Sequence, residues 1–100
     1  MKKQFKYCEI VENRANSDQI YTIKILAPQI VADCQPGQFV NLYFANDVKI
    51  FPRPFSISEI KDDQLFIRYK TIGSQTKKMS RWQAGDQVKI LGPLGNSFSV

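Results

Sequence analysis

The sequence predicts an all-β protein, a six-stranded antiparallel Greek key barrel with one short helix. Short stretches of alternating apolar and polar residues recur about every ten residues, which is typical of small β-sandwiches and barrels. Turn residues bound these stretches, among them Pro36-Gly37, Lys61-Asp62-Asp63 and Ala84-Gly85-Asp86. Closure of the sheet into a barrel would pair the strand edges that otherwise stay exposed.

The alternating stretches define the six predicted strands. They are residues 5–11, 20–26, 38–44, 55–60, 64–71 and 87–91. The pattern is clearest in the fifth, where Leu65, Ile67 and Tyr69 fall on one side and Arg68 and Lys70 on the other.

One segment, residues 74–82, lacks the alternation and contains residues that favour helices. It is therefore predicted as the one short helix. Ser74 or Thr76 would cap its start. Met79 and Trp82 lie three residues apart, so they would share the buried face of the helix.

Length and composition indicate one globular domain that spans residues 1–100. The chain is 43% hydrophobic and 23% charged, close to globular averages, and no linker divides it. No apolar run approaches the roughly 18 residues that a membrane span needs. The basic start, Met1-Lys2-Lys3, is not followed by an apolar run, so no secretion signal is predicted. We expect a cytoplasmic protein without membrane contact.

Histidine is absent and the chain has two cysteines, Cys8 and Cys34, with no CxxC motif. The commonest general base and the usual zinc and iron–sulfur ligand sets are therefore missing. In a reducing cytosol we expect both cysteines to be free, small, buried hydrophobic residues. No nucleophile–base pair is visible, so a self-contained hydrolase is not predicted, and any chemistry would come from a cofactor.

The net charge is +5. It permits contact with nucleic acid, a membrane surface or phosphorylated ligands, but the basic residues are scattered along the chain. Their densest group is Lys77-Lys78 with Arg81. An ordinary surface of mixed charge explains this distribution as well as a nucleic-acid footprint does.

The segment 51–58 places Arg53 between two prolines, followed by Phe55 and Ser56. Each proline fixes its own φ angle, and Pro54 pushes Arg53 towards an extended backbone. An arginine held in this way suits a phosphate, because its guanidinium group can bind two oxygens at once. The same residues also fit a proline-stiffened strand start with a solvated arginine and a core phenylalanine, and they leave both interpretations open.

Three further segments carry weaker signals. Residues 71–76 combine a glycine with small hydroxyl residues at a helix start, which suits either an anion or ordinary N-capping. Residues 91–98 and 35–40 contain glycine and proline and are read as turns.

Taken in order, these segments resemble the flavin-binding barrel of the ferredoxin reductase superfamily. Within it, the chain is most similar to the electron transfer subunits of bacterial NAD-dependent dihydroorotate dehydrogenases. The resemblance covers nearly the whole chain, and each motif is modest alone, whereas the ordered set is specific. The matching segments are residues 27–28, 36–40, 53–57, 68–70, 73–76, 84–86 and 92–96.

The resemblance implies FAD as the cofactor and assigns residues to it. Arg53, in the Arg53-Pro54-Phe55-Ser56 motif, would pair with the pyrophosphate. Phe55 would lie against the isoalloxazine ring, and Ser56 would form a hydrogen bond near N5.

The resemblance also assigns two segments along the flavin and its phosphates. The strand residues Arg68, Tyr69 and Lys70 would line both, largely through backbone groups. Gly73, Gln75 and Thr76 match a Gly-x-Gly-Thr phosphate loop, in which Gln75 replaces the second glycine and a side chain would crowd the pyrophosphate.

The resemblance implies electron transfer between NADH and a dihydroorotate dehydrogenase catalytic subunit, in pyrimidine biosynthesis. In the family a nucleotide-binding domain and a two-iron, two-sulfur centre follow the segment 92–95, and both are absent from this chain. We therefore expect a flavin domain that is not competent for NADH turnover alone.

The sequence is also compatible with two other functions. One is a single-stranded nucleic-acid binder with an OB-like barrel, which +5 charge and 12% aromatic residues permit. The other is a flavin-free assembly module, which the side chain of Gln75 favours.

Overall fold

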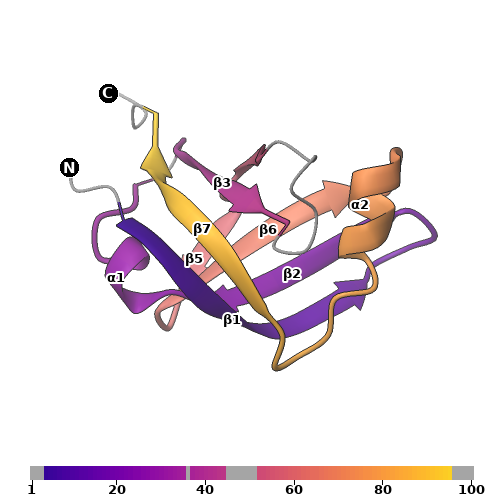
Figure 1. Ribbon diagram of the computed structural model, residues 1–100, viewed down its shortest axis with the longest axis horizontal. Coiled ribbons are helices and arrows are strands. Elements are labelled where there is room, and N and C mark those ends of the chain that lie inside the picture. The colour runs from indigo at the N-terminus through magenta and orange to yellow at the C-terminus, as the bar shows by residue number, and fades with distance from the viewer. Residues whose placement is uncertain (1–3, 36, 45–51, 96–100) are drawn as a thin grey trace.

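Seven antiparallel strands form one sheet in the order β4-β3-β7-β1-β2-β6-β5 (Figure 1). The computed structural model describes residues 4–35, 37–44 and 52–95. Its elements are β1 (Gln4–Ala15), β2 (Ile20–Leu26), α1 (Pro28–Val31), β3 (Phe39–Tyr43), β4 (Arg53–Ser56), β5 (Glu59–Lys61), β6 (Gln64–Lys70), α2 (Ser74–Met79) and β7 (Gln87–Leu94). Residues 36, 51 and 96–98 of the predicted motifs lie outside the described residues.

The two outermost strands of the sheet, β4 and β5, follow each other in the chain with only Ile57 and Ser58 between them. The N–H of Ile57 donates to the carbonyl of Gln38, next to β3, at 3.2 Å. The N–H of Ser58 donates to the carbonyl of Phe66, in β6, at 2.8 Å. Because one short segment reaches both ends of the sheet, the sheet must curl round on itself. The predicted all-β barrel is confirmed.

The strand count differs from the prediction for the same reason. The segment 55–60 was predicted as one strand, but it forms part of β4, which pairs with β3, and part of β5, which pairs with β6. Alternation along the chain does not reveal this change of partner. A second helix, α1, also appears, because Pro28 ends β2 and then occupies the first turn of a helix, where its missing N–H costs nothing.

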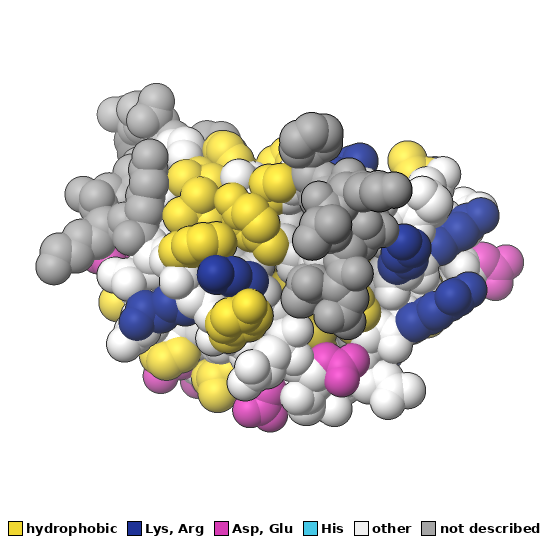
Figure 2. Space-filling view, viewed as in Figure 1, with side chains coloured by type: hydrophobic (Ala, Val, Ile, Leu, Met, Phe, Trp, Pro, Cys, Tyr) yellow, Lys and Arg dark blue, Asp and Glu magenta, His cyan; other side chains and the backbone are white. Residues whose placement is uncertain are grey.

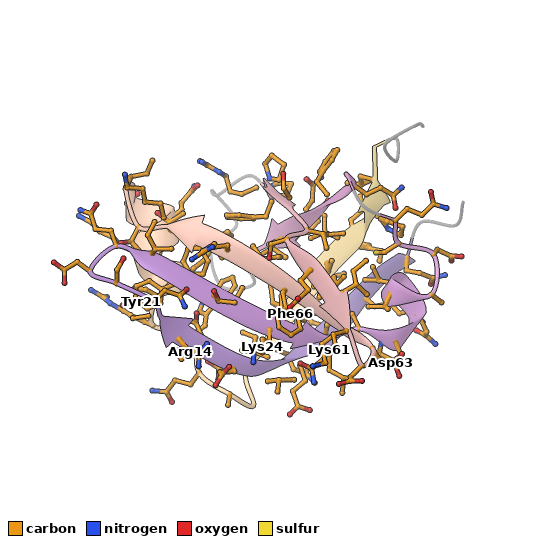
Figure 3. All side chains as sticks on the ribbon, turned by 180° about the vertical axis from the view of Figure 1, so that it is seen from behind. Arg14, Tyr21, Lys24, Lys61, Asp63 and Phe66 are labelled. Carbon is orange, nitrogen blue, oxygen red and sulfur yellow. The ribbon has the colours of Figure 1, made fainter. Side chains whose placement is uncertain are left out.

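The core is filled by the inward side of every long strand. In β2 and β6, which pair directly, Ile23 faces Ile67 and Ile25 faces Leu65, and all four side chains are fully buried. The buried hydrophobic residues are Cys8, Ile10, Ile23, Ile25, Ala27, Ile30, Val40, Leu42, Phe44, Leu65, Ile67, Tyr69, Met79, Val88 and Ile90. On the outer side, Lys24 lies over the ring of Phe66 and pairs with Glu12 at 2.9 Å (Figure 3).

The N-cap of helix α2 lies one residue before Ser74 and three before Thr76, the two predicted caps. Gly73 is the N-cap residue, and its N–H donates to the hydroxyl of Thr76 at 3.1 Å. The helix ends at Met79, so Trp82 lies beyond it, yet Trp82 still packs on the ring of Phe44 at 5.1 Å. The two predicted apolar residues therefore do face the core, although the helix is three residues shorter than predicted.

The outer face of β1, β7 and β3 carries an aromatic cluster around one lysine. The ammonium group of Lys89 lies 4.0 Å from the ring centroid of Phe5 and 5.2 Å from that of Tyr7. Tyr43 packs on Phe5 at 5.0 Å. Figure 2 shows hydrophobic side chains gathered on this face around a basic one.

Among the described residues, no helix is long and apolar enough to cross a membrane.

Both cysteines are free, as predicted, with Cys8 buried and Cys34 half-buried. Burial raises the pKa of the Cys8 thiol. Burial, with Asp33 beside it, raises the pKa of Cys34 to about 11. Within the described residues no cluster of three or more potential metal ligands occurs.

Both thiols of the folded protein should react slowly with Ellman's reagent at pH 8. The thiolate is the nucleophile, and a raised pKa leaves little of it, so we expect rates about tenfold below that of a free thiol. The same protein in urea is the control and should react at the ordinary rate. A fast phase in the folded protein would contradict the burial of these side chains.

Candidate functional site

A cavity of about 520 Å³ opens between β4, the end of β6 and the start of α2. Its volume lies within the range of small-molecule sites. Eight of the ten predicted cofactor-binding residues line it, together with Ile72 and Ser74, which were not among those ten. The lining residues are Arg53, Phe55, Arg68, Tyr69, Lys70, Ile72, Gly73, Ser74, Gln75 and Thr76.

The two predicted residues that do not line this cavity are Pro54 and Ser56. Strand geometry explains this, because successive side chains of β4 point to opposite faces. Arg53 and Phe55 share the face towards the cavity, and Pro54 and Ser56 share the other. Pro54 instead constrains the backbone of Arg53.

Among the described residues, three cations and no carboxylate line the cavity, so it favours an anionic ligand. Arg53 comes from β4, whereas Arg68 and Lys70 come from the end of β6, and all three are exposed. Strand alternation places Arg68 and Lys70 on the same side of β6, with the buried Tyr69 between them. Charge therefore reaches the cavity from two strands that are far apart in the sequence.

The apolar part of the cavity comes from two rings and one aliphatic side chain. Phe55 meets Tyr69 edge to face, with ring centroids 6.4 Å apart. Tyr69 is stacked on Tyr21 at 5.6 Å. Ile72 is 74% exposed, which is unusual for a large aliphatic side chain. Apolar and cationic groups together suit an amphipathic anion, with a flat apolar part and a charged part.

Asn13 links three elements behind the cavity. Its Nδ2 donates to the carbonyls of Met79 at 2.7 Å and Trp82 at 2.9 Å, and its Oδ1 accepts the hydroxyl proton of Tyr69 at 2.8 Å. The end of α2 is thereby tied to β1 and β6. Sequence reasoning missed Asn13, because it lies beyond the predicted strand 5–11, whereas β1 continues to Ala15.

Across the mouth of the cavity, Nη1 of Arg53 donates to Oε1 of Gln75 at 2.7 Å. The bond joins β4 to the first turn of α2. Gln75 thus directs its amide oxygen at the arginine that the sequence singled out.

A second cavity, of about 370 Å³, lies on the other side of the end of β6. Arg68, Tyr69 and Lys70 line both cavities, and Asn16, Ser17 and Ile20 complete the second. The end of β6 is therefore accessible from two sides.

The family model described as the oxidoreductase FAD-binding domain matches residues 8–98 of this chain. Two of the most similar curated relatives are each called dihydroorotate dehydrogenase B (NAD(+)), electron transfer subunit. The one from Clostridium acetobutylicum is 33% identical over 100 residues, which is 100% of this chain and 39% of the relative. The one from Fusobacterium nucleatum is 34% identical over 97 residues, or 93% of this chain and 37% of the relative. The chain thus spans about two-fifths of the length of these relatives.

Solved structures show the same architecture. An NADH-dependent reduced ferredoxin–NADP oxidoreductase superimposes with a TM-score of 0.84 at 25% identity, over 92% of this chain and 34% of that one. A ferredoxin NADP+ reductase from Neisseria gonorrhoeae, solved with bound FAD and NADP, gives a TM-score of 0.77 at 22% identity, over 94% of this chain and 39% of that one. At 22% identity, the similarity to the reductase from Neisseria gonorrhoeae shows only that the fold is shared.

Replacing Asn13 with alanine should lower the free energy of unfolding by about 2–3 kcal/mol, because three hydrogen bonds are lost and their partners stay partly buried. Urea unfolding measures this. The matched control is Asn16→Ala, which removes an exposed acceptor of the Thr22 hydroxyl and should cost less than about 0.5 kcal/mol. Equal effects of the two substitutions would show that Asn13 is not a structural link.

The stability of the fold should fall between about pH 10 and pH 12. Burial raises the pKa of Tyr69 to about 12, whereas a tyrosine in the unfolded chain ionises near pH 10. In that window the unfolded chain binds fewer protons, so the free energy of unfolding decreases as the pH rises.

Tyr69→Phe removes this ionisation. At pH 8 its free energy of unfolding should be about 1 kcal/mol below that of the wild type, because one hydrogen bond is lost. Between pH 10 and pH 12 its free energy of unfolding should fall by about 1–2 kcal/mol less than that of the wild type. Urea unfolding at both ends of the window measures the difference. Parallel pH profiles would contradict the burial of the Tyr69 hydroxyl.

Proposed function

Because this chain belongs to the family of oxidoreductase FAD-binding domains, we propose that it holds FAD in the cavity between β4, β6 and α2. The observation that carries the proposal is the composition of that cavity. Apolar rings and three cations line one space, and FAD combines a flat aromatic ring system with a doubly charged pyrophosphate.

The start of α2 supports the fit. Apart from its two neighbours in the chain, no described residue has an atom within 4 Å of the position that a Cβ of Gly73 would take, and the φ angle of Gly73 is −134°. Neither contacts within the described chain nor backbone strain therefore demand a glycine here. Gly73 lines the cavity, so close approach of a ligand is a reason for a residue without a side chain.

We assign the residues as follows. Arg53 binds the pyrophosphate through its planar guanidinium group, helped by the charges of Arg68 and Lys70. Phe55 and Tyr69 pack against the isoalloxazine ring.

The remaining predicted residues surround this arrangement. Pro54 fixes the backbone of Arg53, whereas the side chain of Ser56 lies on the other face of β4, so we assign it no contact with FAD in this cavity. Backbone groups of Gly73, Gln75 and Thr76 lie along the phosphates. FAD, when bound, supplies the chemistry, accepting hydride and releasing electrons.

For the whole protein we propose the role that is given in the names of its relatives. This domain would act within an electron transfer subunit that takes electrons from NADH and serves a dihydroorotate dehydrogenase catalytic subunit in the cytoplasm. An NAD-binding domain and an iron–sulfur centre would lie outside residues 1–100. Neither the family match nor the relatives support the nucleic-acid-binding alternative.

Arg53→Ala should weaken FAD binding about 10- to 100-fold, since a hydrogen bond to a charged group contributes about 1.5–3 kcal/mol. The wild-type protein is mixed with excess FAD, desalted and examined by visible absorption, and affinities are then measured by titration. We expect retained flavin bands in the wild type and their loss in Arg53→Ala.

Arg14→Ala is the matched control. Arg14 is an exposed arginine on the outer part of β1 that does not line the cavity (Figure 3). The substitution Arg14→Ala removes the same charge as Arg53→Ala and should leave FAD affinity unchanged. A colourless wild-type protein, or equal losses in the two variants, would refute the proposed site.

A further inference from the structure

Among the described cations that line the cavity, Arg53 is the one whose side chain forms a hydrogen bond with another side chain. Its Nη1 donates to Oε1 of Gln75 at 2.7 Å, between residues 22 positions apart in the sequence. Among the described residues, Arg68 and Lys70 show no corresponding side-chain hydrogen bond. The hydrogen bond to Gln75 therefore distinguishes Arg53 from Arg68 and Lys70.

The bond uses one of the five N–H groups of the guanidinium. The remaining donors, including an edge with two parallel N–H groups, stay available for oxygens of a phosphate. An unrestrained arginine has many rotamers, and binding through it requires that one be selected. A bond to the short helix α2 restricts that choice before any ligand arrives.

We propose that Gln75 is a positioning residue for Arg53, which holds the guanidinium at the mouth of the cavity and so raises affinity for ligands that carry a phosphate. The inference rests on the proposed function, because the phosphate is that of FAD. It reverses the expectation from the sequence, in which the side chain at this position crowds the pyrophosphate.

The two ideas make opposite predictions for a smaller side chain. If Gln75 crowds the ligand, shortening it should tighten FAD binding. If Gln75 positions Arg53, shortening it should weaken binding. We expect Gln75→Ala to weaken FAD binding about three- to tenfold, as is typical for losing the pre-organisation of one long side chain.

Gln75→Met is the matched control for size. Methionine has a similar length and volume, but it lacks the amide oxygen and its thioether sulfur is only a weak acceptor for the bond from Arg53. Gln75→Met should therefore behave like Gln75→Ala. Gln75→Glu offers a carboxylate instead, which would pair with Arg53 and cancel its charge, and it should weaken FAD binding more than either.

A double-mutant cycle tests whether Gln75 acts through Arg53. In the Arg53→Ala background, Gln75→Ala should have no further effect on FAD affinity. Riboflavin, which lacks phosphate, serves as a second probe, and its affinity should change less than twofold on Gln75→Ala. Thermal unfolding of each variant checks the fold, which we expect to be retained because the bond between these residues is exposed.

The outcomes separate the two proposals. A wild-type protein that does not bind FAD would overturn the proposed function and this inference together. A wild-type protein that binds FAD, with Gln75→Ala equal to or tighter than it, would overturn the inference alone. So would wild-type affinity in Gln75→Met, or the same loss from Gln75→Ala with and without Arg53.

Discussion

The candidate site depends on one amide side chain that does not touch its cavity. Asn13 joins the end of α2 to β6 by accepting from Tyr69 and donating to the carbonyls of Met79 and Trp82. Helix α2 is only six residues long, too short to be stable by itself. Its position therefore comes from tertiary contacts, and the position of α2 fixes where Gln75 meets Arg53.

Barrel closure supplies the other half of the site. The change of partner at Ile57 and Ser58 brings β4 against β6 although β4 pairs with β3. Phe55 thereby meets the ring of Tyr69, and Arg53 faces the charges at the end of β6. Rigid strands supply the rings and cations, while a short tethered helix supplies the glycine and the amide. The site is thus held by hydrogen bonds and ring packing from both sides of the cavity.

Local patterns predicted most of the fold, because alternation and turn residues are local properties. Residues 20–26 follow from such patterns. The local residues around Arg53 and Phe55 left two interpretations open, and the ordered set of motifs was needed to assign them to a ligand. The split of residues 55–60 does not, since it depends on which distant strand each half meets. The role of Asn13 depends on partners 56 and 66 positions away in the sequence. The sequence contains one weak indication that Ile72 belongs to the site, because it is an apolar residue directly before Gly73.

Trp82 gives the molecule an internal optical reporter. It is the one tryptophan of the chain, it packs against Phe44, and its carbonyl accepts a hydrogen bond from Asn13. Helix α2, whose far end lines the cavity, is about 9 Å long at 1.5 Å per residue. Indole emits light at wavelengths that oxidised flavins absorb, so resonance energy transfer over this short separation would quench the emission. Cofactor occupancy would thus register in the ultraviolet emission of the protein, independently of flavin colour.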